Sequence, residues 1–279
     1  MKQPIVPHAL VSLVLCGCAN PTASPSGVPN ATPSPSPSSA ASPTPSPTIV
    51  TNAACNEIAF YLDPILATGY TCETWAADPG PMNPHPALTR ITLVGYSPSA
   101  TNPNSPQIFV MSVSDYTATG PTTFATSLAD LQGLIGASSP PVYGISAPTP
   151  MPVLPDTGGI PGPFAQFGWV SFADGDGVRF ITQKSFDAVP LGNDQTFYTF
   201  QGLTADNQYW VSAILPIQHS ILPATVNDPP VGMTWDQFWA DYDNYMTTTV
   251  NQLNGQPPDT FDPPIGLLDA LISSIVFVP

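Results

Sequence analysis

The sequence predicts an α+β fold, with an antiparallel sheet of hairpins packed by two or three helices in a single domain. Three observations lead to this prediction. Short segments alternate apolar and polar residues between turn residues, which is typical of antiparallel hairpins. Longer segments repeat apolar residues with the helical period. Residues 49–279, which follow a proline-rich stretch, are long enough for one sizeable core.

The N-terminus has the layout of an export signal. Lys2 supplies a short positive region, and residues 9–15 form an apolar run that is too short to span a bilayer as a helix. The run ends in Leu-Cys-Gly-Cys at residues 15–18, which resembles the lipobox of bacterial lipoproteins. That resemblance implies cleavage after Gly17 and a diacylglycerol group on the Cys18 thiol.

Cys16 fits the lipobox less well, because Leu15 would then occupy the −1 position, where a small side chain is required. An ordinary secretory signal with two incidental cysteines is the alternative interpretation. A lipidated cysteine usually carries more than one acyl chain, and two chains are enough for stable anchoring. We therefore expect a signal peptide at residues 1–17 and a protein exported and anchored through Cys18 to the outer face of a bacterial membrane, on the cell surface or the periplasmic side.

Residues 18–48 are predicted to form a stalk outside the fold. After the cysteine, the segment consists almost entirely of Pro, Ser, Thr, Ala and Gly and carries no charged residue. It has too little apolar surface to offset the entropy cost of folding. Frequent prolines favour extended polyproline II geometry, so the segment could reach on the order of 90 Å. It either lifts the domain off the membrane or serves as a passive linker.

The charge balance excludes several partners. The chain has 19 acidic and only four basic residues, and its pI is about 4.1. Removal of the signal peptide would leave Arg90, Arg179 and Lys184 as the only basic side chains. Nucleic-acid binding and electrostatic docking on anionic lipid both need a basic patch, so we expect neither. The membrane contact is expected to come from the N-terminal lipid alone.

Cys55 and Cys72 are predicted to form a disulfide, since they are the remaining cysteine pair in an oxidising compartment. The bridge would close a loop of roughly 17 residues, which corresponds to about 3 kcal/mol in the chain-entropy estimate. Within it, residues 56–71 include several apolar side chains, Ile65 among them, that suggest a short buried element. Zinc binding is the rival interpretation, but two thiolates without further ligands nearby make a poor zinc site.

The next segments predict two strands and a helix. Residues 88–97 and 107–113 alternate apolar and polar side chains around a turn-rich connection, which indicates adjacent antiparallel strands. Residues 123–135 repeat apolar positions with helical spacing, and Gly136 ends the helix. Residues 137–163 are dense in Pro and Gly. Such a long structureless loop is unusual in a compact domain and is either functional or a mobile flap.

Two hairpins follow. Residues 167–172 and 178–183 flank an Asp-Gly-Asp-Gly turn, and residues 196–203 and 209–217 flank a turn at 205–207. Asp-Gly and Asp-Asn favour the positive φ angles of tight hairpin turns. The second hairpin resembles one found in uncharacterised bacterial surface lipoproteins, a resemblance that implies compartment and fold but no activity.

Asp174 and Asp176 also resemble the first half of a calcium loop. An EF-hand would need a further acidic or amide residue at the fifth position and Glu at the twelfth, where this chain has Val178 and Ser185. The pattern therefore fails, and we predict a turn and no metal site.

The clearest predicted helix begins after Thr234, where Gln237 completes a capping box, and ends before Gly255. Its aromatic and apolar residues follow one stripe, which is typical of a helix face packed against a sheet. Stacking on sugar rings is the alternative, and exposure of three aromatic side chains would favour it: Trp235, Trp239 and Tyr242.

The C-terminal residues 265–278 are strongly apolar and are predicted to close the core as a helix or a strand. Asp269 and the short length argue against a membrane span.

No specific catalytic or cofactor motif emerges from the sequence, so we predict no cofactor and leave any catalytic residues unassigned. The first hypothesis is a non-catalytic surface domain that binds an extracellular glycan or protein, through residues 137–163 or exposed aromatic side chains. The second is a secreted hydrolase that uses Asp carboxylates on a glycan-type substrate, assisted by His85 or His219.

Overall fold

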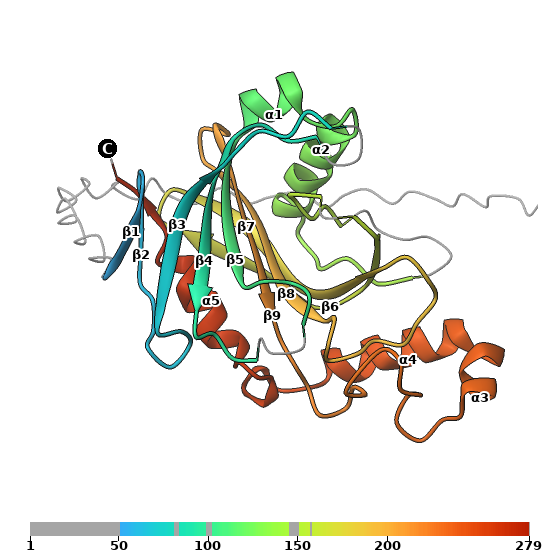
Figure 1. The fold of residues 1–279 in the computed structure, drawn as a ribbon. Helices are drawn as coiled ribbons and strands as arrows, with labels where there is room; N and C mark the ends of the chain where they lie inside the picture. Colours follow the sequence, from blue (N-terminus) through green and yellow to red (C-terminus); the bar gives the residue numbers. More distant parts are fainter. Residues whose placement is uncertain (1–50, 81–83, 99–101, 145–150, 157, 279) are drawn as a thin grey trace, which may run out of the picture. The chain divides into compact units, whose positions relative to one another are not determined.

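The computed structural model describes residues 51–80, 84–98, 102–144, 151–156 and 158–278. The chain divides into two units, Met1–Ser46 and Pro47–Pro279, and the fold described below belongs to the second. It is an α+β fold with a seven-stranded antiparallel sheet and a smaller three-stranded sheet, which confirms the predicted class (Figure 1). No helix in these ranges is both long and apolar enough to cross a membrane.

All neighbouring strands of the large sheet are antiparallel. Their order is β3 (Gly69–Trp75), β4 (Leu88–Val94), β5 (Gln107–Ser112), β9 (Tyr209–Pro216), β8 (Phe197–Thr204), β7 (Gly175–Ser185) and β6 (Ile160–Phe172). The predicted antiparallel pairing of β4 with β5 is confirmed, since Ile91 lies opposite Ile108. Both predicted hairpins are present as well.

The alternation of side chains along the strands gives the sheet two apolar faces. One face carries Phe109, Phe180 and Trp210 and is covered by α1 (Val113–Thr119) and α2 (Phe124–Ile135). The opposite face carries Ile108 and Phe200 and packs against α4 (Tyr242–Asn254) and α5 (Ile265–Ser273). Figure 1 shows α1 and α2 together at one end of the sheet and α5 behind the strands. The core therefore consists of two layers with the sheet between them.

The first helices agree with the sequence in part. The helix predicted at residues 123–135 is confirmed, with Thr123 and Gly136 at its ends. Helix α1 was not predicted, because Val113 was assigned to the end of a strand. Ser112 begins this helix as its N-cap, and its side chain accepts a hydrogen bond from the Asp115 backbone N–H.

The helix predicted between Thr234 and Gly255 is two helices. Helix α3 (Trp235–Ala240) ends at Asp241, whose φ of −138° and ψ of 37° break the helical path before α4 begins. The predicted capping box between Thr234 and Gln237 is present. A short 3₁₀ helix, η1 (Pro258–Thr260), follows α4.

A small sheet joins the two ends of the domain. Its strands are β1 (Ala53–Cys55), β2 (Ile58–Phe60) and β10 (Val276–Phe277). The C-terminal segment predicted as a helix or a strand thus forms both, α5 and then β10. Phe277 is fixed further by its backbone N–H, which donates to Asp174 Oδ2 at 2.7 Å.

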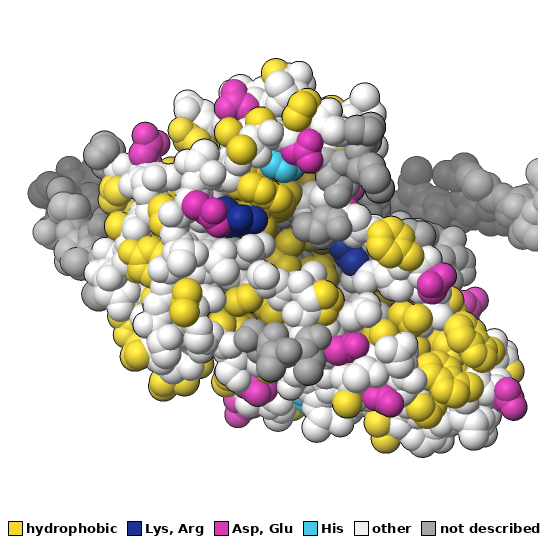
Figure 2. Space-filling view, viewed as in Figure 1, with side chains coloured by type: hydrophobic (Ala, Val, Ile, Leu, Met, Phe, Trp, Pro, Cys, Tyr) yellow, Lys and Arg dark blue, Asp and Glu magenta, His cyan; other side chains and the backbone are white. Residues whose placement is uncertain are grey.

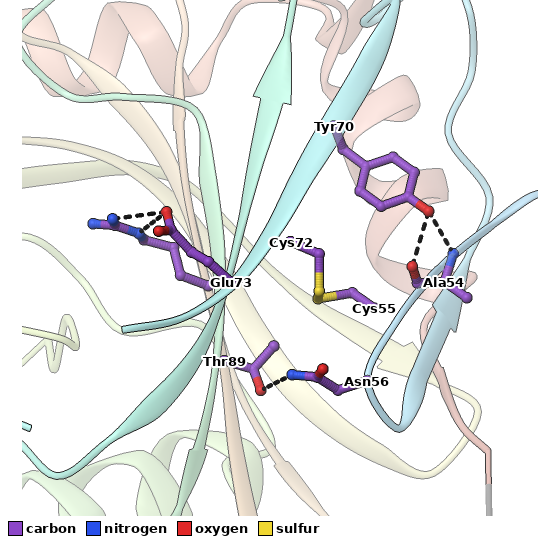
Figure 3. Close-up of a disulfide and its surroundings, with 8 residues drawn as sticks. Ala54, Cys55, Asn56, Tyr70, Cys72, Glu73 and Thr89 are labelled. Carbon is purple, nitrogen blue, oxygen red and sulfur yellow. Dashed lines mark hydrogen bonds and ion pairs between the residues drawn. A yellow bond between two sulfur atoms is a disulfide. The ribbon is translucent and has the colours of Figure 1, made fainter. Parts of the chain in front are cut away.

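The predicted Cys55–Cys72 disulfide is present and links the small sheet to edge strand β3 of the large one (Figure 3). Beside it, the Tyr70 hydroxyl donates to the Ala54 carbonyl at 2.8 Å and accepts from the Ala54 N–H at 3.0 Å. Within the loop closed by the bridge, β2 is buried as expected. Ile65 is 81% exposed, however, so its expected burial is wrong.

The described part of residues 137–159 has no helix or strand, as expected, but the expected loop ends earlier than residue 163, and a mobile flap is the wrong description of residues 151–155. Residues 151–155 are all buried and lie over the sheet face that carries α2, and strand β6 already begins at Ile160. We call residues 151–155 the strap. The Leu154 N–H donates to Gln201 Oε1 at 3.2 Å, and the Ser212 hydroxyl donates to the Leu154 carbonyl. Polar side chains on the sheet thus satisfy both backbone groups of Leu154, which favours its burial.

Candidate functional site: a polar cleft beside an aromatic surface

A cleft of about 750 Å³ lies on the sheet face that carries the strap, at the strand ends remote from α1. This volume is within the usual range for small-ligand sites. Its floor comes from four strands: Arg90 of β4, Gln107 of β5, Ile214 of β9 and Lys184 of β7. Gln107 and Ile214 are direct cross-strand partners, so their side chains share this face. Figure 2 shows basic side chains near the middle of the corresponding surface.

Arg90 is held on the cleft floor by its neighbours. Its Nε and Nη2 atoms both donate to Glu73 Oε1, at 3.0 and 2.8 Å, because Glu73 lies directly opposite it on β3. The guanidinium also lies 4.7 Å from the centre of the Trp75 ring, in cation–π geometry. Both contacts leave Nη1 of Arg90 without a hydrogen-bond partner among the described residues.

Lys184 lines the same cleft but is more deeply placed. Its side chain is only 9% exposed, and its Nζ lies 3.3 Å from Asp156 Oδ1 just after the strap. Burial lowers the pKa of Lys184, and the neighbouring Asp156 carboxylate opposes that change. The ion pair thus ties the end of the strap to the sheet at the edge of the cleft.

Amide and hydroxyl groups supply most of the remaining polar lining. Asn104 donates to the Gln195 carbonyl at 3.3 Å, and Gln107 donates to Thr92 Oγ1 at 3.3 Å. Asn227 contributes a further amide to the lining. A side-chain amide offers a hydrogen-bond donor and an acceptor side by side. Two adjacent hydroxyls of a sugar ring can match it, one by accepting from the amide NH₂ group and the other by donating to the amide oxygen. The lining therefore fits a neutral, hydroxyl-rich molecule.

The positive charges of Arg90 and Lys184 do not make the cleft a binding site for anions. Each has a carboxylate partner, Glu73 for Arg90 and Asp156 for Lys184. Asp187 adds another acidic residue to the lining. The local charge is therefore close to neutral or slightly negative, which disfavours phosphate or carboxylate ligands.

Phe186 stands between the cleft and a second hollow. Its side chain is 80% exposed, and the residue lines both spaces. The second hollow, of about 240 Å³, continues to Tyr242 and Met246 on α4. The two spaces also share Ser185 and Val189, so they have a common wall.

The aromatic stripe of α3 and α4 is only partly core. Phe238 is fully buried, as expected, but Trp239 is 56% exposed, and Trp235 and Tyr242 are half-buried. The break at Asp241 explains the difference, because α3 does not continue along the buried face of α4. The exposure that would favour stacking on a sugar ring is thus present at Trp239 and only partial at Trp235 and Tyr242.

Neither histidine suggested as a catalytic aid lies in the cleft lining. His85 is buried, and its ring lies 4.4 Å from that of Trp75. His219 is buried too; its Nε2 lies 3.0 Å from Thr260 Oγ1, and its Nδ1 accepts from the Ile221 N–H at 3.3 Å. Since Thr260 donates its hydroxyl proton to the Pro257 carbonyl, Nε2 of His219 is the donor and the ring is neutral. Burial lowers its pKa accordingly.

Asp174 and Asp176 line a different hollow of about 590 Å³, together with Asp206. The turn lies at residues 173–174. Asp176 belongs to β7, so its predicted place in the turn is wrong. Its Oδ1 accepts from the Ser171 hydroxyl at 2.6 Å. Hydrogen bonds from Thr204 and the Gln208 N–H lower the pKa of Asp206, which does not suit a general acid. Across the described ranges, no group of three His, Cys, Asp or Glu residues is placed to hold a metal ion.

Cys18 and the proposed stalk lie outside the described residues. Comparisons with protein-family models, curated proteins and solved structures find no match to this chain. The lipobox and hairpin resemblances therefore stay predictions.

Sequence reasoning missed the cleft and its principal residues, Arg90, Gln107, Lys184 and Phe186. One signal was available, since Arg90 and Lys184 are two of only three basic residues after Lys2. They are 94 positions apart by their numbers, however, and only the strand order β4-β5-β9-β8-β7 brings them to one face.

Proposed function

We propose that this protein is an exported lipoprotein, anchored through Cys18, whose folded domain binds a neutral extracellular glycan in the polar cleft without chemical conversion. One observation carries the glycan assignment: the cleft is lined by amide and hydroxyl groups with balanced charge and has an exposed phenylalanine ring at its rim. Polar groups fix orientation in such sites, and an aromatic face covers the apolar side of a sugar ring.

The hydrolase hypothesis has less support. Asp187 is the one acidic residue in the described lining of the cleft, whereas glycosidases use a pair of carboxyl groups. The hollow with three aspartates holds Asp174, Asp176 and Asp206 in structural hydrogen bonds. We therefore favour binding over catalysis.

The proposed binding is tested with the full chain purified in a sugar-free detergent. Calorimetric titration with neutral disaccharides and hexasaccharides of glucose, xylose, mannose and N-acetylglucosamine should find a ligand. Gln107→Ala combined with Asn227→Ala should weaken it by about tenfold or more, since each lost ligand hydrogen bond is worth about 1 kcal/mol. Ile65→Ala, at an 81% exposed site away from the cleft, is the control. Absence of binding, or binding unaffected by the double substitution, would reject the glycan site.

The proposed anchor is tested independently in the native host or a bacterial expression host. Cys18→Ser should yield unprocessed or released protein, whereas Cys16→Ser should leave lipidation intact. Mass spectrometry of the mature N-terminus and membrane fractionation are the measurements. A Cys18→Ser protein that remained processed and membrane-bound would show that another residue holds the anchor.

A further inference from the structure

Three aromatic side chains, one exposed and two half-buried, form one surface on α3 and the start of α4. We define the aromatic surface as Trp235, Trp239 and Tyr242, which all pack around the buried ring of Phe238. Ring-centre distances to Phe238 are 5.7, 4.8 and 5.4 Å respectively. A fully buried ring at the centre holds the outer three in place, so the surface is pre-formed.

Two tryptophans of this surface share one orientation. Trp235 and Trp239 are four residues apart and therefore lie on the same side of α3. Their ring centres are 6.2 Å apart, and their planes differ by only 21°. The two rings are stacked, so each offers at most its outer face to a ligand, and the face of Trp239, which is 56% exposed, is the more accessible.

The aromatic surface is continuous with the polar cleft. Phe186 and Val189 line both the cleft and the second hollow, and that hollow ends at Tyr242. The two hollows thus lead from the amides of the cleft, past the exposed Phe186 ring, to Tyr242, which packs on Phe238 as both tryptophans do. Figure 2 shows large apolar side chains gathered over α3 and α4 with acidic side chains among them.

Charge decides which class of occupant fits this path. Asp236, Asp241 and Asp243 are exposed on α3 and α4, and the chain has no Lys or Arg after Lys184. Anionic membranes and acidic polysaccharides would be repelled here. Carboxylates accept hydrogen bonds from sugar hydroxyls, so a neutral polysaccharide meets no such penalty.

We propose that the ligand is a neutral glycan of several sugar units, bound along a continuous path from the cleft over Phe186 to Trp239 and Trp235. This inference rests on the proposed glycan-binding function and specifies the length of its ligand. A short glycan would occupy the cleft alone, whereas a longer one would also stack on the tryptophans.

The test compares ligand lengths in the full chain in sugar-free detergent. For a neutral glycan found to bind, its disaccharide and hexasaccharide are titrated against Trp239→Ala, Trp239→Phe and the control Ile65→Ala. The Trp239→Ala protein should bind the hexasaccharide about tenfold more weakly and the disaccharide unchanged. Trp239→Phe keeps an aromatic face and should lose less. Hexasaccharide binding should also change tryptophan fluorescence, and this change should shrink in Trp239→Ala.

The outcomes separate the two proposals. If no neutral glycan of either length binds, the proposed function fails and this inference fails with it. If the cleft substitutions abolish binding but Trp239→Ala affects neither length, only the extended path is wrong. Equal losses for both lengths in Trp239→Ala would also reject the path. A wild-type dimer, detected by light scattering, that becomes monomeric in Trp239→Ala would instead assign the aromatic surface to a second copy of the chain.

Discussion

At the residue scale, the Cys55–Cys72 bridge supports the fold where its secondary structure is weakest. Strand β1 has only three residues and pairs with β2 alone, so few backbone hydrogen bonds hold it. The bridge fixes it to edge strand β3, which has seven residues but little buried surface. A covalent link here replaces the packing that a short strand and an exposed edge strand cannot supply.

We predict that replacing both cysteines by alanine lowers the free energy of unfolding by about 3 kcal/mol, because the unfolded chain gains the freedom of an open loop. Urea unfolding with and without reductant measures the effect. Reductant should lower the stability of the wild type to that of the variant and leave the variant unchanged. Equal stability of the wild type and the variant without reductant would contradict the prediction.

His219 is predicted to make stability depend on pH. Its neutral ring donates to Thr260 and accepts from the Ile221 N–H, so protonation of Nδ1 would break the second contact. The pKa is therefore lower in the folded state than in the unfolded state, where it is about 6.5. The unfolded chain takes up the proton first as pH falls. The stabilisation by the neutral His219 ring is therefore present above about pH 6.5 and is lost as the pH falls toward the lower pKa that His219 has in the folded state.

The comparison that isolates His219 is with His219→Gln, whose amide can still donate to Thr260 but does not titrate. Relative to this variant, the wild type should lose stability when pH falls from about 7.5 to about 5.5. Unfolding free energies measured by urea titration across this range give the difference. Parallel pH curves for the two proteins would show that this ring does not contribute.

At the element scale, the strap demonstrates how a Pro-rich segment becomes part of the core. Gln201 is completely buried on β8 and joins four groups: it accepts from the Trp210 indole at 2.8 Å and the Leu154 N–H, and donates to Thr199 and Ser212. The strap thus closes over the sheet with its polar backbone groups at Leu154 paired. Its far end is held by the Asp156–Lys184 ion pair at the cleft.

We predict that Gln201→Leu lowers the free energy of unfolding by about 3 kcal/mol, because it leaves buried donors of Trp210 and Leu154 without acceptors. Hydrogen exchange in residues 151–156 should accelerate, since the strap loses its central attachment. Gln208→Leu, at an exposed position of the same hairpin, is the matched control and should change stability little. Similar losses in both variants would contradict this role of Gln201.

The broken aromatic helix belongs to the element scale as well. Sequence periodicity predicts a single buried stripe from Trp235 to Leu253, and the α4 part of it is confirmed by the burial of Met246 and Val250. The change of direction at Asp241 turns Trp239 toward solvent instead. One residue outside helical geometry therefore separates the residues that stabilise the core from those available to a ligand.

At the scale of the whole molecule, the charge distribution is strongly one-sided. The 19 acidic residues of the chain outnumber its four basic ones, and three of those four form ion pairs, at Arg90, Arg179 and Lys184. The remaining carboxylates repel one another across the surface. Net charge of this size opposes the compact state while keeping the protein soluble.

We predict that the melting temperature rises when sodium chloride is increased from about 0.01 M to about 0.15 M, because the screening length falls from about 30 Å to about 8 Å. Differential scanning calorimetry at fixed pH measures this, and potassium chloride at equal concentration controls for specific ion effects. A falling melting temperature would mean that screening of the three ion pairs outweighs relief of the repulsion.

The sequence by itself determined the α+β class, the two hairpins, the helix predicted at residues 123–135 and the Cys55–Cys72 bridge, because each depends on local periodicity, turn residues or cysteine pairing. Only the tertiary structure decided the strand order, the burial of the strap and the exposure of Trp239. Strand order assembles the cleft from residues as distant as Arg90 and Lys184, and no local pattern encodes that meeting. Local interactions specify elements, whereas a binding site depends on long-range packing between them.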